Sequence, residues 1–268
     1  MSMFSAMLLH NVKRTYKLWI AFFLILLMYQ TVIIGMYDPD NAEAFEQMME
    51  MLPPQVADAM RFQLVDSTLT GFISGYYYGF IIRLFPMIFT ITLAYSLIAK
   101  HVESGTLANY LSTPLSRRRF FAVQTFTLFG MLTDLFIAVS LSGWAFSALL
   151  FPGTLDLGPY FLMNLGAFSL FIAIGGIAFM FSSFFNEGRL ALSFAIGVPL
   201  LMFVLDMLRG VSENLDVLKY FTLFSLFDHV AFYQGDTLVP LWVGLSLFVG
   251  VLTTIVGYVV FTRKDLTL

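Results

Sequence analysis

Long apolar runs, separated by short polar segments, dominate the chain. A transmembrane helix needs about 20 mostly apolar residues, and six runs reach roughly this length. The first run is too long for the apolar core of a signal peptide, which spans roughly 7–15 residues. The pattern predicts an all-α integral membrane protein with one transmembrane domain, residues 1–268, whose six helices span about 18–36, 78–98, 121–149, 160–181, 190–208 and 239–261.

The composition supports a membrane protein. Of the 268 residues, 59% are hydrophobic and 12% are charged, whereas soluble domains have roughly 45–50% and 25%. So few charges cannot form the polar surface of a soluble enzyme, and they exclude a nucleic-acid binder with a basic face. The chain has no cysteine, which excludes thiol catalysis, disulfides and Cys-ligated metals.

Basic residues are distributed unevenly over the predicted loops. If both termini are cytoplasmic, ten basic residues lie on that side, and only Arg61, Arg83, Arg209 and Lys219 lie outside or near the outer boundary. The acids show the reverse, with three inside and thirteen outside. Positive charge concentrates on cytoplasmic loops, so the sequence predicts a multi-pass protein with both termini in the cytoplasm.

The predicted membrane interior holds two ionisable side chains. Asp134 lies inside the third span, and Arg83 lies near the outer end of the second. An unpaired charge at mid-bilayer costs on the order of 2.5–3.5 kcal/mol. At about 1.5 Å per residue, the two side chains reach comparable depths, so we expect an ion pair between adjacent helices. We interpret this pair as structural rather than as a contact for substrate or protons.

Sequence motifs of common enzymes are absent. The chain has no P-loop, no G-x-S-x-G and no H-E-x-x-H. Its histidines, His10, His101 and His229, fall in three segments on opposite sides of the predicted membrane, so we expect no metal site. The chain is therefore predicted not to be an enzyme.

Two polar segments carry apolar patterns of their own. Between spans two and three, Leu107, Tyr110 and Leu111 follow helical spacing, and the helix must stop before Pro114. So short a helix is marginal alone, which implies either a partner to dock against or a turn packed on the protein's own helix ends. Before the last span, the apolar run 217–227 is expected to lie at the membrane interface or to re-enter the membrane as an external hairpin.

The segment between spans two and three resembles a known family. Glu103-Ser-Gly-Thr-Leu107, followed by Leu111-Ser-Thr-Pro114-Leu-Ser-Arg117, is similar to the coupling segment of ABC-2-type transporter permeases. The six spans, the basic amphipathic lead-in, the external hairpin and the ending Phe261-Thr-Arg-Lys-Asp265 are also similar to that family. One departure is His101, where many relatives carry a second acid.

The resemblance implies a permease subunit of an ATP-driven exporter in a prokaryotic plasma membrane. Two permeases, identical or paralogous, would pair with two ABC ATPase subunits that bind ATP and Mg, and this chain would hold no cofactor. Its cargo would be amphipathic or lipophilic, a drug or a peptide. A second cytoplasmic contact would be formed by Glu187 and Arg189. The ATPase would be contacted by Glu103, Gly105, Thr106, Leu107, Tyr110, Leu111, Pro114 and Arg117.

Three other functions compete with this interpretation. A secondary transporter working alone would need more ionisable groups inside the membrane than Asp134 and Arg83, although inverted repeats would favour it. An intramembrane enzyme would need paired catalytic groups at similar depth, and these two residues are a poor fit to any hydrolase. A noncatalytic assembly subunit in the membrane stays open, because docking segments look alike.

Overall fold

The computed structural model describes residues 3–38, 53–62, 65–103, 116–185 and 187–263. This part of the chain forms helices and no strands, and six helical stretches are long and apolar enough to cross a membrane. The predicted all-α fold with six membrane-spanning helices is thereby confirmed.

Most spans extend beyond the apolar runs that predict them. The lead-in before the first run continues into the first span as one unbroken helix. The second span begins nine residues before Tyr78 and is built from three consecutive segments, the middle one a π-helix. In chain order the spans are α1 (Met3–Met36), α4 (Leu69–Ile73) with η1 (Ser74–Ile81) and α5 (Ile82–Leu97), α8 (Arg117–Leu150), α9 (Leu157–Phe184), α10 (Gly188–Val211) and α12 (Val239–Arg263).

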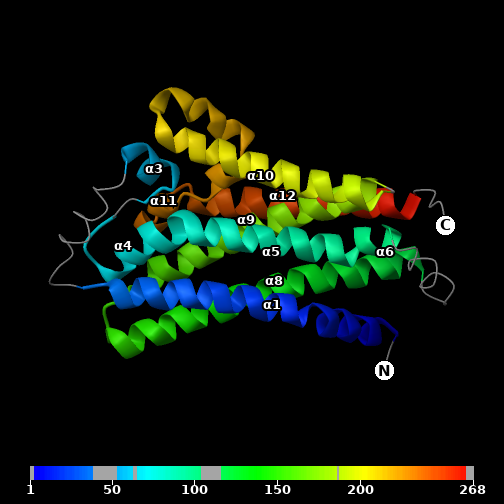
Figure 1. Cartoon of the computed structure of the whole chain (residues 1–268), viewed down its shortest axis with the longest axis horizontal. Coiled ribbons are helices and arrows are strands. Elements are labelled where there is room, and N and C mark those ends of the chain that lie inside the picture. The colour runs from blue at the N-terminus through cyan, green and yellow to red at the C-terminus, as the bar shows by residue number, and fades with distance from the viewer. Residues whose placement is uncertain (1–2, 39–52, 63–64, 104–115, 186, 264–268) are drawn as a thin grey trace.

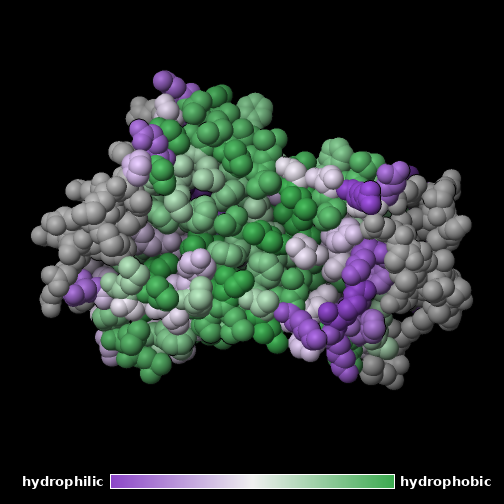
Figure 2. All heavy atoms as spheres, viewed as in Figure 1, coloured by the Kyte–Doolittle hydropathy of each residue, from purple (hydrophilic) through white to green (hydrophobic). Residues whose placement is uncertain are grey.

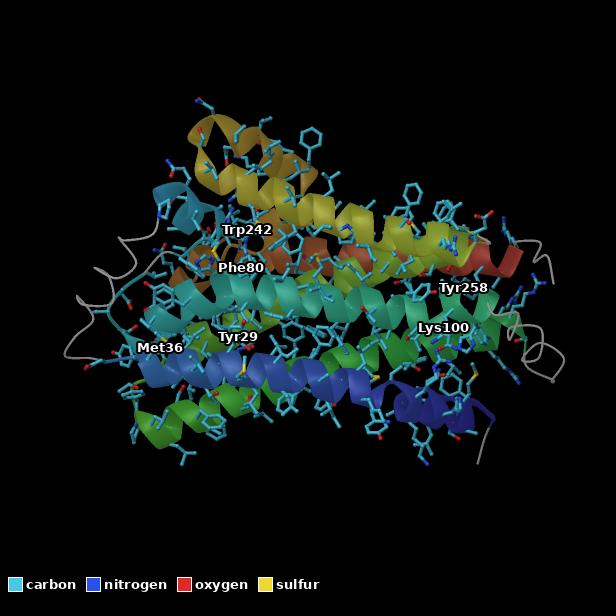
Figure 3. The ribbon with its side chains drawn as sticks, viewed as in Figure 1. Tyr29, Met36, Phe80, Lys100, Trp242 and Tyr258 are labelled. Carbon is cyan, nitrogen blue, oxygen red and sulfur yellow. The ribbon has the colours of Figure 1, made fainter. Side chains whose placement is uncertain are left out.

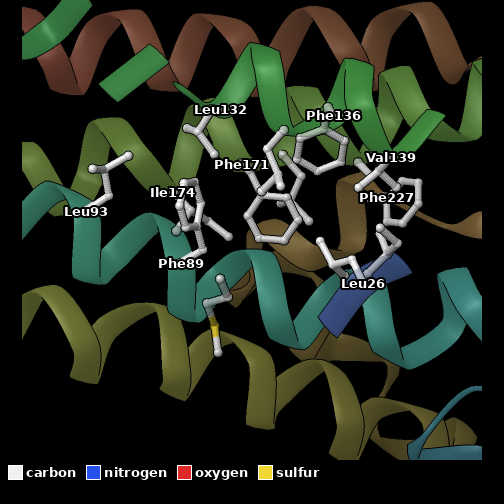
Figure 4. Packing of buried hydrophobic residues seen from close by; sticks show 14 of the residues in the cluster. Leu26, Phe89, Leu93, Leu132, Phe136, Val139, Phe171, Ile174 and Phe227 are labelled. Atoms are coloured by element: carbon white, nitrogen blue, oxygen red, sulfur yellow. The ribbon is translucent and has the colours of Figure 1, made fainter. Parts of the chain in front are cut away.

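The helix α9 lies at the centre of the bundle. It is apolar on all sides, as expected of an enclosed helix, and it packs against α5, α8, α10 and α12. Figure 4 shows Phe171 and Ile174 of α9 between Phe136 of α8 and Phe89 of α5, all of them buried. The core of the protein is therefore formed around α9.

Helix α1 runs parallel to α8 along one side of the bundle (Figure 1). Near its start, Asn11 Nδ2 donates to Gln124 Oε1 at 2.8 Å. Towards its other end, Gln30 Nε2 donates to the Tyr160 hydroxyl at 3.3 Å, and Ser142 Oγ donates to Gln30 Oε1 at 3.1 Å. Because buried polar groups need partners, these contacts fix the register between the two helices. The opposite face of α1 exposes large apolar side chains, which suits contact with lipid.

The two ends of the bundle differ in charge. Helix α1 begins, α12 ends and the short helix α6 (Ala99–Glu103) lies at one end, which we call the basic end (Figure 1). Figure 2 shows hydrophilic side chains gathered near this end beside a broad hydrophobic middle. Figure 3 places Lys100 and Tyr258 towards it and Met36 at the opposite end.

Short helical segments cover the opposite end. After α10 the chain turns back along it as η2 (Glu213–Phe221) and η3 (Leu223–Leu226), and α11 (His229–Gln234) then packs on α9 and η1. Helix α3 (Pro54–Ala59) packs against α10. The segment from η2 to α11 corresponds to the predicted external hairpin, and its position relative to a bilayer stays a prediction.

Candidate functional site

A cluster of charged side chains, buried at its centre, joins α5, α10 and the short segments of the opposite end. Its central acid is Asp206 of α10, which is 2% exposed. Asp206 Oδ2 accepts a hydrogen bond from Arg83 Nη1 of α5, and Oδ1 lies 3.2 Å from Arg61 Nη2 and 3.9 Å from Arg209 Nη1. One carboxylate therefore contacts three guanidinium groups.

A second acid completes the cluster. Asp228, the residue that caps α11, lies 3.4 Å from Arg61 Nη1 and 3.8 Å from Arg209 Nη2 through its Oδ2 atom. Arg83 also donates to the carbonyl oxygen of Phe227, and its guanidinium carbon lies 5.5 Å from the centre of that ring. We call Arg61, Arg83, Asp206, Arg209 and Asp228 the Asp206 network. Its members bring α5 and α10 together with the chain just before the second span and the chain before α12.

Arg61 holds a backbone conformation that few side chains adopt. Its φ is 51°, in the left-handed region that favours glycine. Arg61 N donates to Asp58 O, and Phe62 N donates to Ala57 O, each at 3.0 Å, which is the Schellman ending of a helix, here α3. A left-handed residue other than glycine costs on the order of 1 kcal/mol or more. The guanidinium contacts with Asp206 and Asp228 offset that cost.

Two glycines allow α3 to reach the network. A β-carbon at Gly79 would collide with the carbonyl oxygen of Arg61, and one at Gly210 would collide with that of Asp58. Gly79 lies in the π-helix η1, and π-helical segments are found frequently at functional sites. The end of α3 is therefore held between η1 and α10 because neither position carries a side chain.

Burial and the arginines of the network shift the pKa values of two groups at its edge, Asp228 and His229. Burial alone would raise the pKa of Asp228, but the positive charges of Arg61 and Arg83 reverse this, and the pKa lies below its ordinary value. Burial and the positive charge of Arg83, against the opposing effect of Asp228, together lower the pKa of His229 to about 3. His229 is therefore neutral and Asp228 ionised at neutral pH.

The predicted ion pair between Arg83 and Asp134 is wrong. Arg83 pairs with Asp206, whereas Asp134 is exposed on α8. Asp134 lies three residues after Met131, whose sulfur accepts a hydrogen bond from Thr15 of α1. Arg83 lies two residues before Phe85, whose ring packs on Tyr29 of α1.

The two side chains consequently lie at different heights. The contacts with α1 place Asp134 level with about residue 18 and Arg83 level with about residue 31 of that helix, which separates them by roughly 20 Å along the bundle. The sequence estimate measured depth from the start of the apolar run in α8. The apolar run in α8 begins closer to the basic end than the apolar run in α1 does. Asp134 therefore lies near the basic end rather than mid-span.

The network explains the basic residues that depart from the positive-inside distribution. Of these four residues, Arg61, Arg83 and Arg209 belong to the network, and Lys219 lies 2.5 Å from Asp216, which in turn lies 3.8 Å from Arg209. The sequence reading missed Asp206 because it counted this acid with the external loops. The signal was present, since Asp206 falls inside the expected fifth span and three residues before Arg209.

At the basic end, two contacts surround the segment between spans two and three. Arg14 Nη1 of α1 lies 2.8 Å from His101 Nε2 of α6. Because arginine can only donate, Nε2 of His101 accepts this hydrogen bond and the imidazole is neutral. On the other side, the Phe120 ring of α8 stacks on Phe261 of α12 at 5.8 Å and meets the His101 ring edge to face at 5.9 Å.

Most residues of the predicted coupling segment lie outside the described residues. These are Gly105, Thr106, Leu107, Tyr110, Leu111 and Pro114. The described flanks are Glu103, the last residue of α6, and Arg117, the first residue of α8, where Ser116 Oγ caps the helix by accepting from Arg119 N at 3.3 Å.

The predicted second cytoplasmic contact is at the same end of the bundle. Glu187 and Arg189 are exposed at the start of α10, and α6 packs against α10. The structure thus brings the described flank of the coupling segment next to the helix that carries this second contact. Within the described ranges, no three His, Asp or Glu side chains are grouped closely enough to hold a metal ion.

The described helices and their polar contacts define a multi-pass α-helical membrane protein. The sequence model of the family described as ABC-2 family transporter protein matches residues 9–266. The chain belongs to this family, as the coupling-segment resemblance predicted, and it is a permease, the membrane subunit of an ABC transporter. Membership of the family implies pairing with an ABC ATPase subunit. A comparison with curated protein sequences gives no match.

Proposed function

We propose that the chain is the permease of an ATP-driven exporter. Two permeases, identical or paralogous, assemble with two ATPase subunits, and these subunits bind ATP and Mg. Both termini lie in the cytoplasm of a prokaryotic cell, because the basic end carries the positive charge expected of cytoplasmic loops. The chain itself changes conformation around a substrate path and forms no covalent intermediate.

The observation that supports coupling to an ATPase is the set of contacts around residues 104–115. The stretch before this segment is joined to α1 by the contact of His101 with Arg14. The stretch after it is joined to α12 by the stacking of Phe120 on Phe261. A displacement of the segment by the ATPase would therefore reach α1, α8 and α12 together, because packed interiors deform little and transmit strain.

The residues that contact the ATPase are proposed from the resemblance. Leu107, Tyr110 and Leu111 are proposed to enter a groove of the ATPase, with Glu103, Gly105, Thr106, Pro114 and Arg117 shaping the segment. Glu187 and Arg189 are proposed as the second contact, since both are exposed on the helix against which α6 packs.

The proposed cargo is amphipathic or lipophilic, either a drug or a peptide. The segments between the spans are short, and they offer no separate domain of the kind that would handle a long polysaccharide outside the membrane. Membrane lipid surrounds the apolar outer faces of the spans.

The proposal is tested by co-purification with a candidate ABC ATPase subunit and by the ATPase activity of the complex. Leu107→Asp and Gly105→Pro are expected to release the ATPase while the permease still elutes as a folded species in detergent. Val217→Asp, which places the same charge on an exposed apolar residue of the opposite end, is the matched control and should retain the ATPase. If the wild type binds no ATPase, or if all three variants bind equally, the proposal fails.

A further inference from the structure

A groove of about 320 Å³ lies between α1 and α8 near the basic end. Aromatic and aliphatic side chains form its walls, with Leu8, Val12, Tyr16 and Trp19 on α1 and Phe126 on α8. The charged side chain that lines it is Asp134. The groove combines an apolar bed, several aromatic faces and one carboxylate.

The register of α1 and α8 places this carboxylate at a defined height. Thr15 Oγ1 donates to Met131 Sδ at 2.8 Å, so Asp134, three residues further along α8, is level with about residue 18, beside Trp19. Trp19 lies two residues after Lys17, the last of the basic residues Lys13, Arg14 and Lys17, and is the second residue of the first apolar run. Asp134 therefore lies where the cytoplasmic boundary of the membrane is expected, at the end of the groove that is farther from the start of α1.

The cations nearest in sequence do not line the groove. Lys13 and Lys17 are exposed on α1, but each follows a groove residue by one position and is turned from it by about 100°. Arg14 is engaged with His101 and the carbonyl oxygen of Ser96. Within the described part of the groove, the charge of Asp134 is thus not matched by a lysine or arginine of the lining.

We propose that this groove binds an amphipathic organic cation, with the positive charge at Asp134 and the apolar body along Val12, Tyr16 and Phe126. A carboxylate attracts the charge, and a cation near the faces of tryptophan and tyrosine gains further attraction from the rings. The apolar body is removed from water as it fills the groove. The claim that such a cation is the cargo would rest on the proposed export function. The claim that it binds in this groove does not rest on that function.

Binding is measured on permease in phosphatidylcholine nanodiscs, without ATPase or ATP. The probe is methyltriphenylphosphonium, and triphenylphosphine oxide, with the same three rings and no charge, is its matched control. The reporter is the emission of Trp19 in a protein carrying Trp144→Phe and Trp242→Phe, which leaves Trp19 as the single tryptophan. Equilibrium dialysis of the unmodified permease, corrected with empty nanodiscs, gives the same affinities if the reporter protein does not fold.

The proposal requires saturable binding of the cation, about tenfold tighter than that of the neutral control. Asp134→Asn should weaken cation binding to the level of the neutral compound. Asp236→Asn removes an exposed acid at the start of α12 and should leave binding unchanged. Equal affinity for the two compounds, equal affinity of Asp134→Asn and the wild type for the cation, or uptake that never saturates would each overturn the proposal. Because no ATPase is present, these outcomes are independent of the co-purification test.

Discussion

Removing the charge of Asp206 tests the central contact of the network. Asp206→Asn keeps the shape of the side chain but leaves Arg83, 1% exposed, and its neighbours Arg61 and Arg209 without their shared carboxylate. Removing one partner of a buried ion pair costs about 3–5 kcal/mol, because the remaining charge is uncompensated. For a chain of this size the corresponding fall in melting temperature is about 6–20 °C.

The assay is thermal unfolding of the purified permease in detergent, followed by size-exclusion fluorescence. Asp216→Asn is the matched control, since Asp216 also contacts Arg209 but is exposed, and exposed ion pairs contribute little. The double variant Arg83→Gln/Asp206→Asn should lose less stability than the two single variants together, because residues in direct contact couple by about 0.5–3 kcal/mol. Equal shifts for Asp206→Asn and Asp216→Asn, or strictly additive single variants, would refute the reasoning.

Four further predictions concern other parts of the structure. Arg61→Gly should destabilise less than Arg61→Ala in the same thermal assay, because both remove the guanidinium but glycine relieves the strained φ of 51°; equal losses would contradict this. Between pH 6.5 and about 3, unfolded His229 binds a proton that the folded chain excludes, so stability falls as the pH drops below about 6.5. His229→Leu should reduce that dependence in melting curves recorded from pH 7 to pH 4.5, and an unchanged slope would argue against it. His101→Glu should keep the melting temperature near that of the wild type, since Arg14 can donate to a carboxylate, whereas His101→Lys places like charges in contact and should lower it. Phe80 of η1 and Phe203 of α10 pack with ring centres 5.9 Å apart, and a short thiol cross-link between Phe80→Cys and Phe203→Cys should leave ATPase stimulation intact, whereas a loss reversed by cleaving the link would show that the two helices separate.

The number of spans could be predicted from the sequence because each span is a long apolar run. Such runs mark the membrane-crossing part of a helix but not where the helix begins. The lead-in is helical because it extends the helix of the first span towards the N-terminus. The nine residues before Tyr78 are helical because a helix starts there after a capping threonine, Thr68, whose Oγ1 accepts from Gly71 N at 3.1 Å.

The Asp206 network could be predicted only in part. Arg83 was recognised as a charge that needed a partner, and this requirement follows from sequence alone. Which acid supplies the partner depends on the register between helices, and hydrogen bonds such as Asn11–Gln124 and Thr15–Met131 set that register. These bonds join residues more than a hundred positions apart, so no periodicity reveals them. The left-handed Arg61 gave no signal, because the usual marker of that conformation is glycine.

Helix α10 connects the two polar regions of the permease. It packs against α6 at the basic end and carries Asp206 about 27 Å further along. A movement that pulled α10 away from α5 would separate Asp206 from Arg83, and each would then be a buried charge without its partner, at a cost of several kcal/mol. A movement that carries α5 and α10 together keeps the pair and avoids this cost. The network therefore favours a transport cycle in which these helices, with η1 and α3, shift as one body and the rearrangement occurs at their contacts with the other spans.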